Sequence, residues 1–250
     1  MAELDFYFDP ICPFAWMTSK WVRQVAGQRE YEVDWRFISL RLVNAEVDYD
    51  THFPPGYERG HTAGLELLRV AAAIRHHHGA SSVGPLYAAI GAELFDSAPG
   101  RQDELHRDTR GFVTPIIEAI GLPAELADAW RDTSYDAEIA AEGNRALGMT
   151  GKDVGTPILH FDPPHGMALF GPVISRLPSA DVAVELWDHV AALARFGGFA
   201  ELKRSLRETP QLRAFGIAEG EIGAEEDWKQ GHRRDVVTGR DRPSDSIKDR

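Results

Sequence analysis

The sequence predicts an α/β protein in which a β-α-β unit and a later β-β-α unit flank a long helical segment. Short runs of β-forming residues occur near the start of the chain and again after residue 156, and amphipathic helical patterns fill the middle. A strand, a turn and a helix follow one another directly around the chain's only cysteine, Cys12. A length of 250 residues permits one large domain, or one domain with an insertion.

The first unit is predicted from the alternation of apolar and turn-forming residues. Residues 4–8 (LDFYF) are typical of a buried strand, and residues 9–11 (DPI) turn the chain. A helix is expected from Cys12 to about Gly27, followed by a second strand over residues 31–38 (YEVDWRFI). A β-α-β order implies a right-handed crossover and two parallel strands.

The middle of the chain is predicted to be helical. The pattern runs from His61 to about Leu147, and the helix expected over residues 104–120 contains Pro115, which should interrupt or kink it. We therefore divide the chain into a first domain and an inserted one: residues 1–47 with 150–206, and a helical insertion, 48–149.

Strand character returns late in the chain. Residues 157–161 and 167–170 are predicted to form an antiparallel hairpin, followed by a helix over 180–194 and a short one over 199–206. Beyond these, residues 207–250 are rich in Gly, Glu, Asp, Arg and Lys and are expected to form a largely disordered tail.

Composition narrows the class of partners. The chain has 27 basic and 39 acidic residues and a net charge of −12, which argues against binding to nucleic acid or to an anionic membrane surface. We find no secretory signal pattern and no apolar stretch long enough to span a bilayer. One cysteine cannot form an internal disulfide, so we expect a cytoplasmic protein, where thiols stay reduced.

Cys12 is the strongest candidate for chemistry. A thiol at the start of a helix lies at the positive end of the helix dipole, which should lower its pKa and favour the reactive thiolate. Pro13 fits the first helical position, where its missing N–H costs nothing. The alternative is that Cys12 is a small buried hydrophobic residue, as free cysteines often are.

The order of elements resembles the thioredoxin fold, with the helical segment in the place where DsbA-like proteins carry their insertion. Residues 12–15 (CPFA) stand where that family has its C-x-x-C motif, and 154–157 (VGTP) resemble the segment holding its cis-proline. The stretches 5–16, 155–157 and 170–178 are similar to the actinobacterial mycothiol-dependent nitroreductase branch of the DsbA family. Kappa-class glutathione transferases and hydroxychromene-carboxylate isomerases are more distant relatives with the same layout.

The resemblance, which covers roughly Leu4 to Pro210, implies roles for neighbouring residues. Pro13 and Phe14 would shape the approach to the sulfur, and Thr156 and Pro157 would form the platform for a substrate thiol. Trp16 lies one helical turn after Cys12, where it would either wall the pocket or pack in the core. The implied partners are mycothiol or another small thiol as co-substrate and an electrophilic or disulfide substrate. No tightly bound cofactor is implied, and a homodimer is left open.

Ala15 departs from the family pattern, because the dithiol members have their second cysteine at this position. Cys12 therefore has no internal resolving partner, which excludes a protein disulfide donor and removes the basis for transferring nitroreductase activity. The favoured hypothesis is a monothiol oxidoreductase that exchanges Cys12 with a small thiol. The alternatives are a transferase or isomerase in which the bound thiol does the chemistry, and a redox-inactive binding protein.

Two other candidates are weaker. Residues 76–78 are consecutive histidines, which point in different directions on a helix, whereas metal pairs need positions i and i+4. They are interpreted as a solvated helix end rather than a metal site. Asp9 lies close to the thiol in sequence and is interpreted as a turn residue in preference to a proton acceptor.

Overall fold

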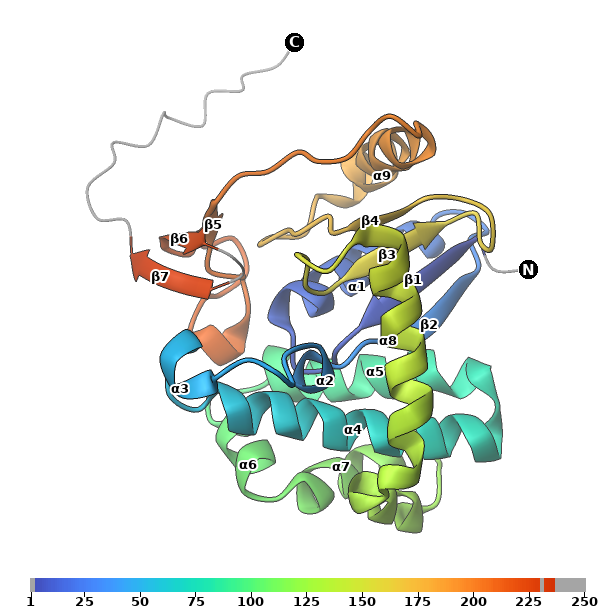
Figure 1. Cartoon of the computed structure of the whole chain (residues 1–250), viewed down its shortest axis with the longest axis vertical. Helices are drawn as coiled ribbons and strands as arrows, with labels where there is room; N and C mark the ends of the chain where they lie inside the picture. The colour runs from blue at the N-terminus through green and yellow to red at the C-terminus, as the bar shows by residue number, and fades with distance from the viewer. Residues whose placement is uncertain (1–2, 230–231, 237–250) are drawn as a thin grey trace.

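The computed structural model describes residues 3–229 and 232–236, and Figure 1 shows their arrangement. The strands in chain order are β1 (Leu4–Phe8), β2 (Val33–Phe37), β3 (Ile158–Phe161), β4 (Ala168–Phe170), β5 (Leu206–Glu208), β6 (Glu225–Lys229) and β7 (His232–Val236). The α-helices are α1 (Pro13–Ala26), α2 (Leu40–Val43), α3 (Tyr49–His52), α4 (Tyr57–His78), α5 (Val83–Gly91), α6 (Arg101–Arg107), α7 (Thr109–Ala119), α8 (Asp136–Thr150) and α9 (Ala180–Arg195).

The main sheet has the strand order β2-β1-β3-β4. β1 and β2 are parallel, whereas β3 is antiparallel to both β1 and β4. This topology is that of a thioredoxin fold, and it confirms the β-α-β unit and the hairpin predicted from the sequence. The carboxyl end of β1 leads directly into the turn before α1, which places Cys12 just beyond the carboxyl end of this interior strand.

One face of the sheet is covered by α1 and α9. Alternate residues of β1, Phe6 and Phe8, lie in the same apolar core as these helices, as the twofold periodicity of a strand requires. The rings of Trp21 on α1 and Trp187 on α9 pack edge to face with centroids 5.5 Å apart. The indole N–H of Trp21 donates to the backbone oxygen of Ala183, which fixes the two helices against each other.

The other face of the sheet is covered by α8. Tyr7 and Ile158 form a second, smaller core with Ala146 on this helix. A carboxylate oxygen of Glu142 on α8 accepts the N–H of Phe37 at the end of β2. Thus α8, which falls within the predicted insertion 48–149, packs on the sheet, while α4 to α7 lie beyond the end of the sheet (Figure 1).

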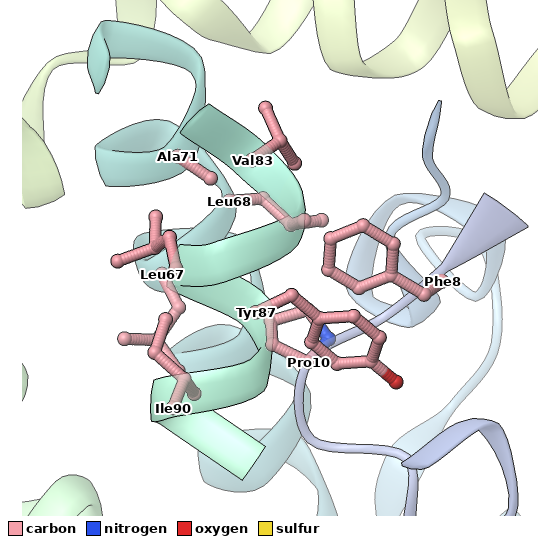
Figure 2. Close-up of a pocket in the computed structure, with 9 residues that line it drawn as sticks. Phe8, Pro10, Leu67, Leu68, Ala71, Val83, Tyr87 and Ile90 are labelled. Carbon is pink, nitrogen blue, oxygen red and sulfur yellow. The ribbon is translucent and has the colours of Figure 1, made fainter. Parts of the chain in front are cut away.

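The helices between β2 and α8 pack against the end of the sheet through aromatic rings. Phe8 stacks on Tyr87 of α5 with ring centroids 3.8 Å apart. Figure 2 shows this contact beside Pro10 and the apolar side chains of α4 and α5, a junction that leaves no room even for a water molecule. The helix predicted over 104–120 is two helices, because Asp108 ends α6 and caps α7; Pro115 lies inside α7.

The segment after α9 differs most from its prediction. Residues 199–204 form no helix, and the segment expected to be a disordered tail is ordered over the described part of 207–250. Here β5, β6 and β7 form a second antiparallel sheet. Leu212 is buried in the main core, and this burial accounts for the order of a segment whose average composition is polar. The rest of the predicted tail, 230–231 and 237–250, lies outside the described residues.

Candidate active site

Cys12 is the N-terminal cap of α1. Its sulfur accepts a hydrogen bond from the N–H of Ala15 (3.4 Å), as a capping side chain does at the first turn of a helix. Its own N–H donates to the backbone oxygen of Asp9, closing the turn between β1 and the helix. Pro13 occupies the first helical position, as the sequence predicts.

The thiol and the predicted proline platform lie together although 144 residues separate Cys12 from Thr156. The Cys12 sulfur is 3.5 Å from the backbone oxygen of Thr156, to which the thiol donates. The Thr156–Pro157 peptide bond is cis, as the resemblance implies. The hydroxyl of Thr156 donates to the backbone oxygen of Tyr7 in β1, so the sheet itself sets the position of this loop.

The environment of the thiol corrects one expectation. Cys12 is only 8% exposed, and burial raises the pKa of its thiol to about 12 rather than lowering it. The N–H groups of Ala15 and Phe14 and the charge of Arg207 act in the opposite direction, whereas the charge of Asp9 adds to the increase. The helix terminus therefore lowers the pKa of Cys12, as predicted, but the increase caused by burial is larger.

Asp9 is more than a turn residue. It is completely buried, and its two carboxylate oxygens accept the N–H of Ile11 (3.1 Å) and the N–H of Leu40 (2.7 Å). It thereby ties the turn before Cys12 to the start of α2. Gly64 on α4 packs directly against it, since a Cβ at this position would lie 2.5 Å from an Asp9 oxygen. Burial raises the pKa of Asp9 from 3.8 to about 7 in spite of the two hydrogen bonds.

The raised pKa of Asp9 predicts that stability falls as the pH increases. The folded protein holds this proton more tightly than the unfolded chain, so its contribution is fully present below about pH 4 and is lost as the pH rises through about 7. We expect the free energy of unfolding, measured by urea denaturation, to fall by about 3 kcal/mol between about pH 5 and pH 8 because of this group.

The matched variant is Asp9→Asn, which cannot ionise. Its amide can accept only one of the two N–H bonds, so the variant should be less stable near pH 5. The pH dependence that Asp9 contributes should disappear from its denaturation profile. An Asp9→Asn profile parallel to that of the unaltered protein would contradict the assignment.

The two predicted aromatic site residues have different surroundings. Trp16 is 4% exposed and packs edge to face on Tyr87 and against Gly91, so it lies in the core between α1 and α5. Phe14 lies in the first turn of α1 and is also buried, and its ring meets Trp228 of β6 with centroids 5.4 Å apart. Of the two rings, Phe14 is the one in contact with the C-terminal segment.

Two residues beside the site were missed by the sequence analysis. Trp228 and Arg207 belong to the segment that was expected to be disordered, and the Arg207 guanidinium lies 5.6 Å from the Phe14 ring centroid and 5.2 Å from that of Trp228. The signal that could have located them is a tryptophan in an otherwise polar run, since a large aromatic ring is costly to leave in water.

The structure also positions the histidine run. His76 lies at the end of α4, where its ring contacts a carboxylate oxygen of Glu138 at 2.6 Å. Within the described residues, no group of three or more His, Cys, Asp or Glu side chains is placed to hold a metal ion. The same part of the chain contains no helix that is both long and apolar enough to cross a membrane.

Comparison with known proteins agrees with this geometry. A family model described as Rv2466c-like, mycothiol-dependent nitroreductase Rv2466c, matches residues 11–204, a range that holds Cys12, the Thr156–Pro157 loop and the strands β2, β3 and β4 of the main sheet. The chain belongs to the Rv2466c-like family. The relationship to the actinobacterial mycothiol-dependent nitroreductase branch that the sequence predicts is thus confirmed, and the family is one of thiol-dependent redox enzymes.

Individual relatives and solved structures are similar to this chain over most of its length, with sequence identities from 12% to 34%. The uncharacterized protein Rv2286c of Mycobacterium tuberculosis is 34% identical over 206 residues, which cover 82% of each chain. Among solved structures, the cytosolic disulfide reductase DsbM of Pseudomonas aeruginosa with GSH has a TM-score of 0.48 and 13% identity, over 76% of this chain and 98% of that one. A putative protein disulfide isomerase of Nitrosomonas europaea has a TM-score of 0.48 and 12% identity, over 75% and 97%.

Proposed function

We propose that this Rv2466c-like protein is a monothiol oxidoreductase that uses Cys12 as its nucleophile and mycothiol as its co-substrate. The observation that carries the proposal is the position of the Cys12 sulfur, at a helix N-terminus and 3.5 Å from the carbonyl that precedes the cis-proline. Family membership supports the choice of mycothiol. A reducing compartment such as the cytoplasm would keep this thiol free, and we propose that the protein works there.

The chemistry follows from having one thiol. The Cys12 thiolate attacks one sulfur of a substrate disulfide, so that a Cys12–S–S–R bond forms, the substrate S–S bond breaks and the other half leaves as a thiolate. A mycothiol thiolate then attacks this mixed disulfide, forms a disulfide with R and releases the Cys12 thiolate. These two steps consume one mycothiol and leave R in a disulfide with mycothiol. A second mycothiol thiolate that displaces R as a thiolate forms mycothiol disulfide and completes the two-electron reduction of the substrate, so no second protein cysteine is needed.

The remaining site residues have supporting roles in this proposal. The backbone of Thr156 and the ring of Pro157 would receive the substrate sulfur beside Cys12, and Pro13 and Phe14 would border the approach. Trp16 would act by fixing α1 against α5, since it is buried there. Ala15 leaves the mixed disulfide to be resolved from outside, because Cys12 is the only cysteine in the chain.

A mass measurement tests the proposal directly. Incubation of the protein with mycothiol disulfide, followed by intact-mass spectrometry, should show one mycothiol added per chain, and free mycothiol should remove it. Protein alkylated at Cys12 beforehand is the control and should stay unmodified. The proposal would be contradicted if the protein that has not been alkylated kept its unmodified mass at a concentration of mycothiol disulfide that modifies a small reference thiol.

A further inference from the structure

The C-terminal segment that lies beyond the family match is fastened beside the active site. The family model ends at residue 204, and β5 begins at Leu206. Glu208 of β5 pairs with the guanidinium of Arg176 (3.0 Å) and accepts from the hydroxyl of Ser175, both in the loop after β4. The N–H of Gln211 donates to the backbone oxygen of Ser175. These bonds hold β5 and β6 against the thioredoxin-like unit.

Because side chains alternate along a strand, Arg207 points to the opposite face of β5 from Glu208. Its guanidinium lies over the rings of Phe14 and Trp228, and the residue is half-buried. Within the described residues it makes no hydrogen bond and no ion pair. Its partner in the β5–β6 ladder is Glu226, whose carboxylate oxygens contact the Trp228 indole N–H and the Thr209 hydroxyl.

A half-buried cation without an anion is costly, and burial lowers the pKa of Arg207 from its ordinary value. The charge of an ionised Cys12 acts in the opposite direction and raises the pKa of Arg207. Three titratable side chains interact electrostatically with the Cys12 thiol. They are Asp9 in the turn after β1, Tyr87 on α5 and Arg207 on β5. Of these three, only Arg207 favours an ionised sulfur.

We propose that Arg207 is a positioning residue that supplies the counter-charge for the Cys12 thiolate, and this inference rests on the function proposed above. The thiolate occurs twice in the cycle, when Cys12 attacks and when mycothiol releases it. Arg207 transfers no proton and no electron in either step. Its positive charge stabilises the anionic sulfur and offsets part of the cost of burying that charge. The backbone N–H groups at the start of α1 offset this cost only in part.

Alkylation kinetics test the inference without any small thiol. In Arg207→Gln we expect the rate of Cys12 alkylation by iodoacetamide near neutral pH to fall about tenfold, because the thiolate loses its opposite charge. The ratio of the rates with anionic iodoacetate and neutral iodoacetamide should also fall, and a change of packing alone would not move this ratio. Arg207→Lys keeps the charge and should recover most of both values.

The matched control is Arg213→Gln, which removes the same charge from an exposed position of the same segment. It should behave as the unaltered protein does. An unchanged ratio of the iodoacetate and iodoacetamide rates in Arg207→Gln would overturn the inference. An unchanged alkylation rate together with a raised KM for anionic disulfides would also overturn it, and would assign Arg207 to substrate binding. Absence of a mycothiol adduct would instead contradict the proposed function and leave the alkylation result standing.

Discussion

Replacing Cys12 by serine should reduce mycothiol-dependent disulfide turnover by at least about a thousandfold, because a hydroxyl cannot replace a thiolate as nucleophile near neutral pH. The fold should survive, since serine is a good helix N-cap and takes over the hydrogen bond that the Cys12 sulfur accepts from the Ala15 N–H. Turnover of bis(2-hydroxyethyl) disulfide with mycothiol measures the loss, and urea denaturation shows that the variant is folded.

The same variant separates the enzyme classes that the sequence left open. Turnover that persists in Cys12→Ser and still requires added thiol would indicate a transferase or isomerase, in which the bound small thiol does the chemistry. Cys12→Ala is the companion control, because it removes both the thiol and the helix cap. It should be equally inactive but less stable than the serine variant by about 1 kcal/mol.

Replacing Gly91 by alanine should destabilise the protein by about 3 kcal/mol. A Cβ at the end of α5 would lie 2.2 Å from a ring carbon of Trp16, and no heavy atoms pack so closely. The ring cannot move aside, because Trp16 is 4% exposed and is held by Tyr87. The displacement should be transmitted to α1, whose first turn positions Cys12. Urea denaturation and the alkylation rate of Cys12 measure the two effects.

Gly148 provides the matched control for this change. It also lies in a helix, α8, but it is exposed and a Cβ there would have no neighbour within 4 Å. Gly148→Ala should therefore stabilise the protein slightly, by about 0.5–1 kcal/mol, through the greater helix propensity of alanine. Equal losses of stability in the two variants would show that packing against Trp16 does not account for the effect at Gly91.

The elements around Cys12 could be predicted because their signals are local. A run of buried β-formers, a proline-containing turn and a cysteine followed by Pro13 define β1 and the start of α1 without tertiary information. The proximity of Thr156 to the thiol came from the family resemblance and not from spacing. The burial that raises the Cys12 pKa could not be predicted, because it depends on residues that pack on the site from distant segments.

The C-terminal sheet was missed for a related reason. Average composition indicates whether a segment can form a core of its own, and residues 206–229 do not need one. Their order depends on a few insertions into an existing surface, chiefly Leu212 in the main core and Trp228 on Phe14. Sequence reasoning that averages over a window does not detect such isolated anchors.

The burial of Cys12 also affects how readily peroxide can oxidise its sulfur. Oxidation of a thiolate gives a sulfenic acid, which dithiol proteins trap by closing a disulfide with their second cysteine before it advances to sulfinic acid. This chain has no second cysteine, so trapping would require a small thiol to arrive from solution. In the resting protein, a sulfur that is 8% exposed and whose pKa is raised by burial is a poor target for peroxide. Between turnovers, burial would therefore slow the oxidation of Cys12, a protection that dithiol proteins obtain from a resolving cysteine.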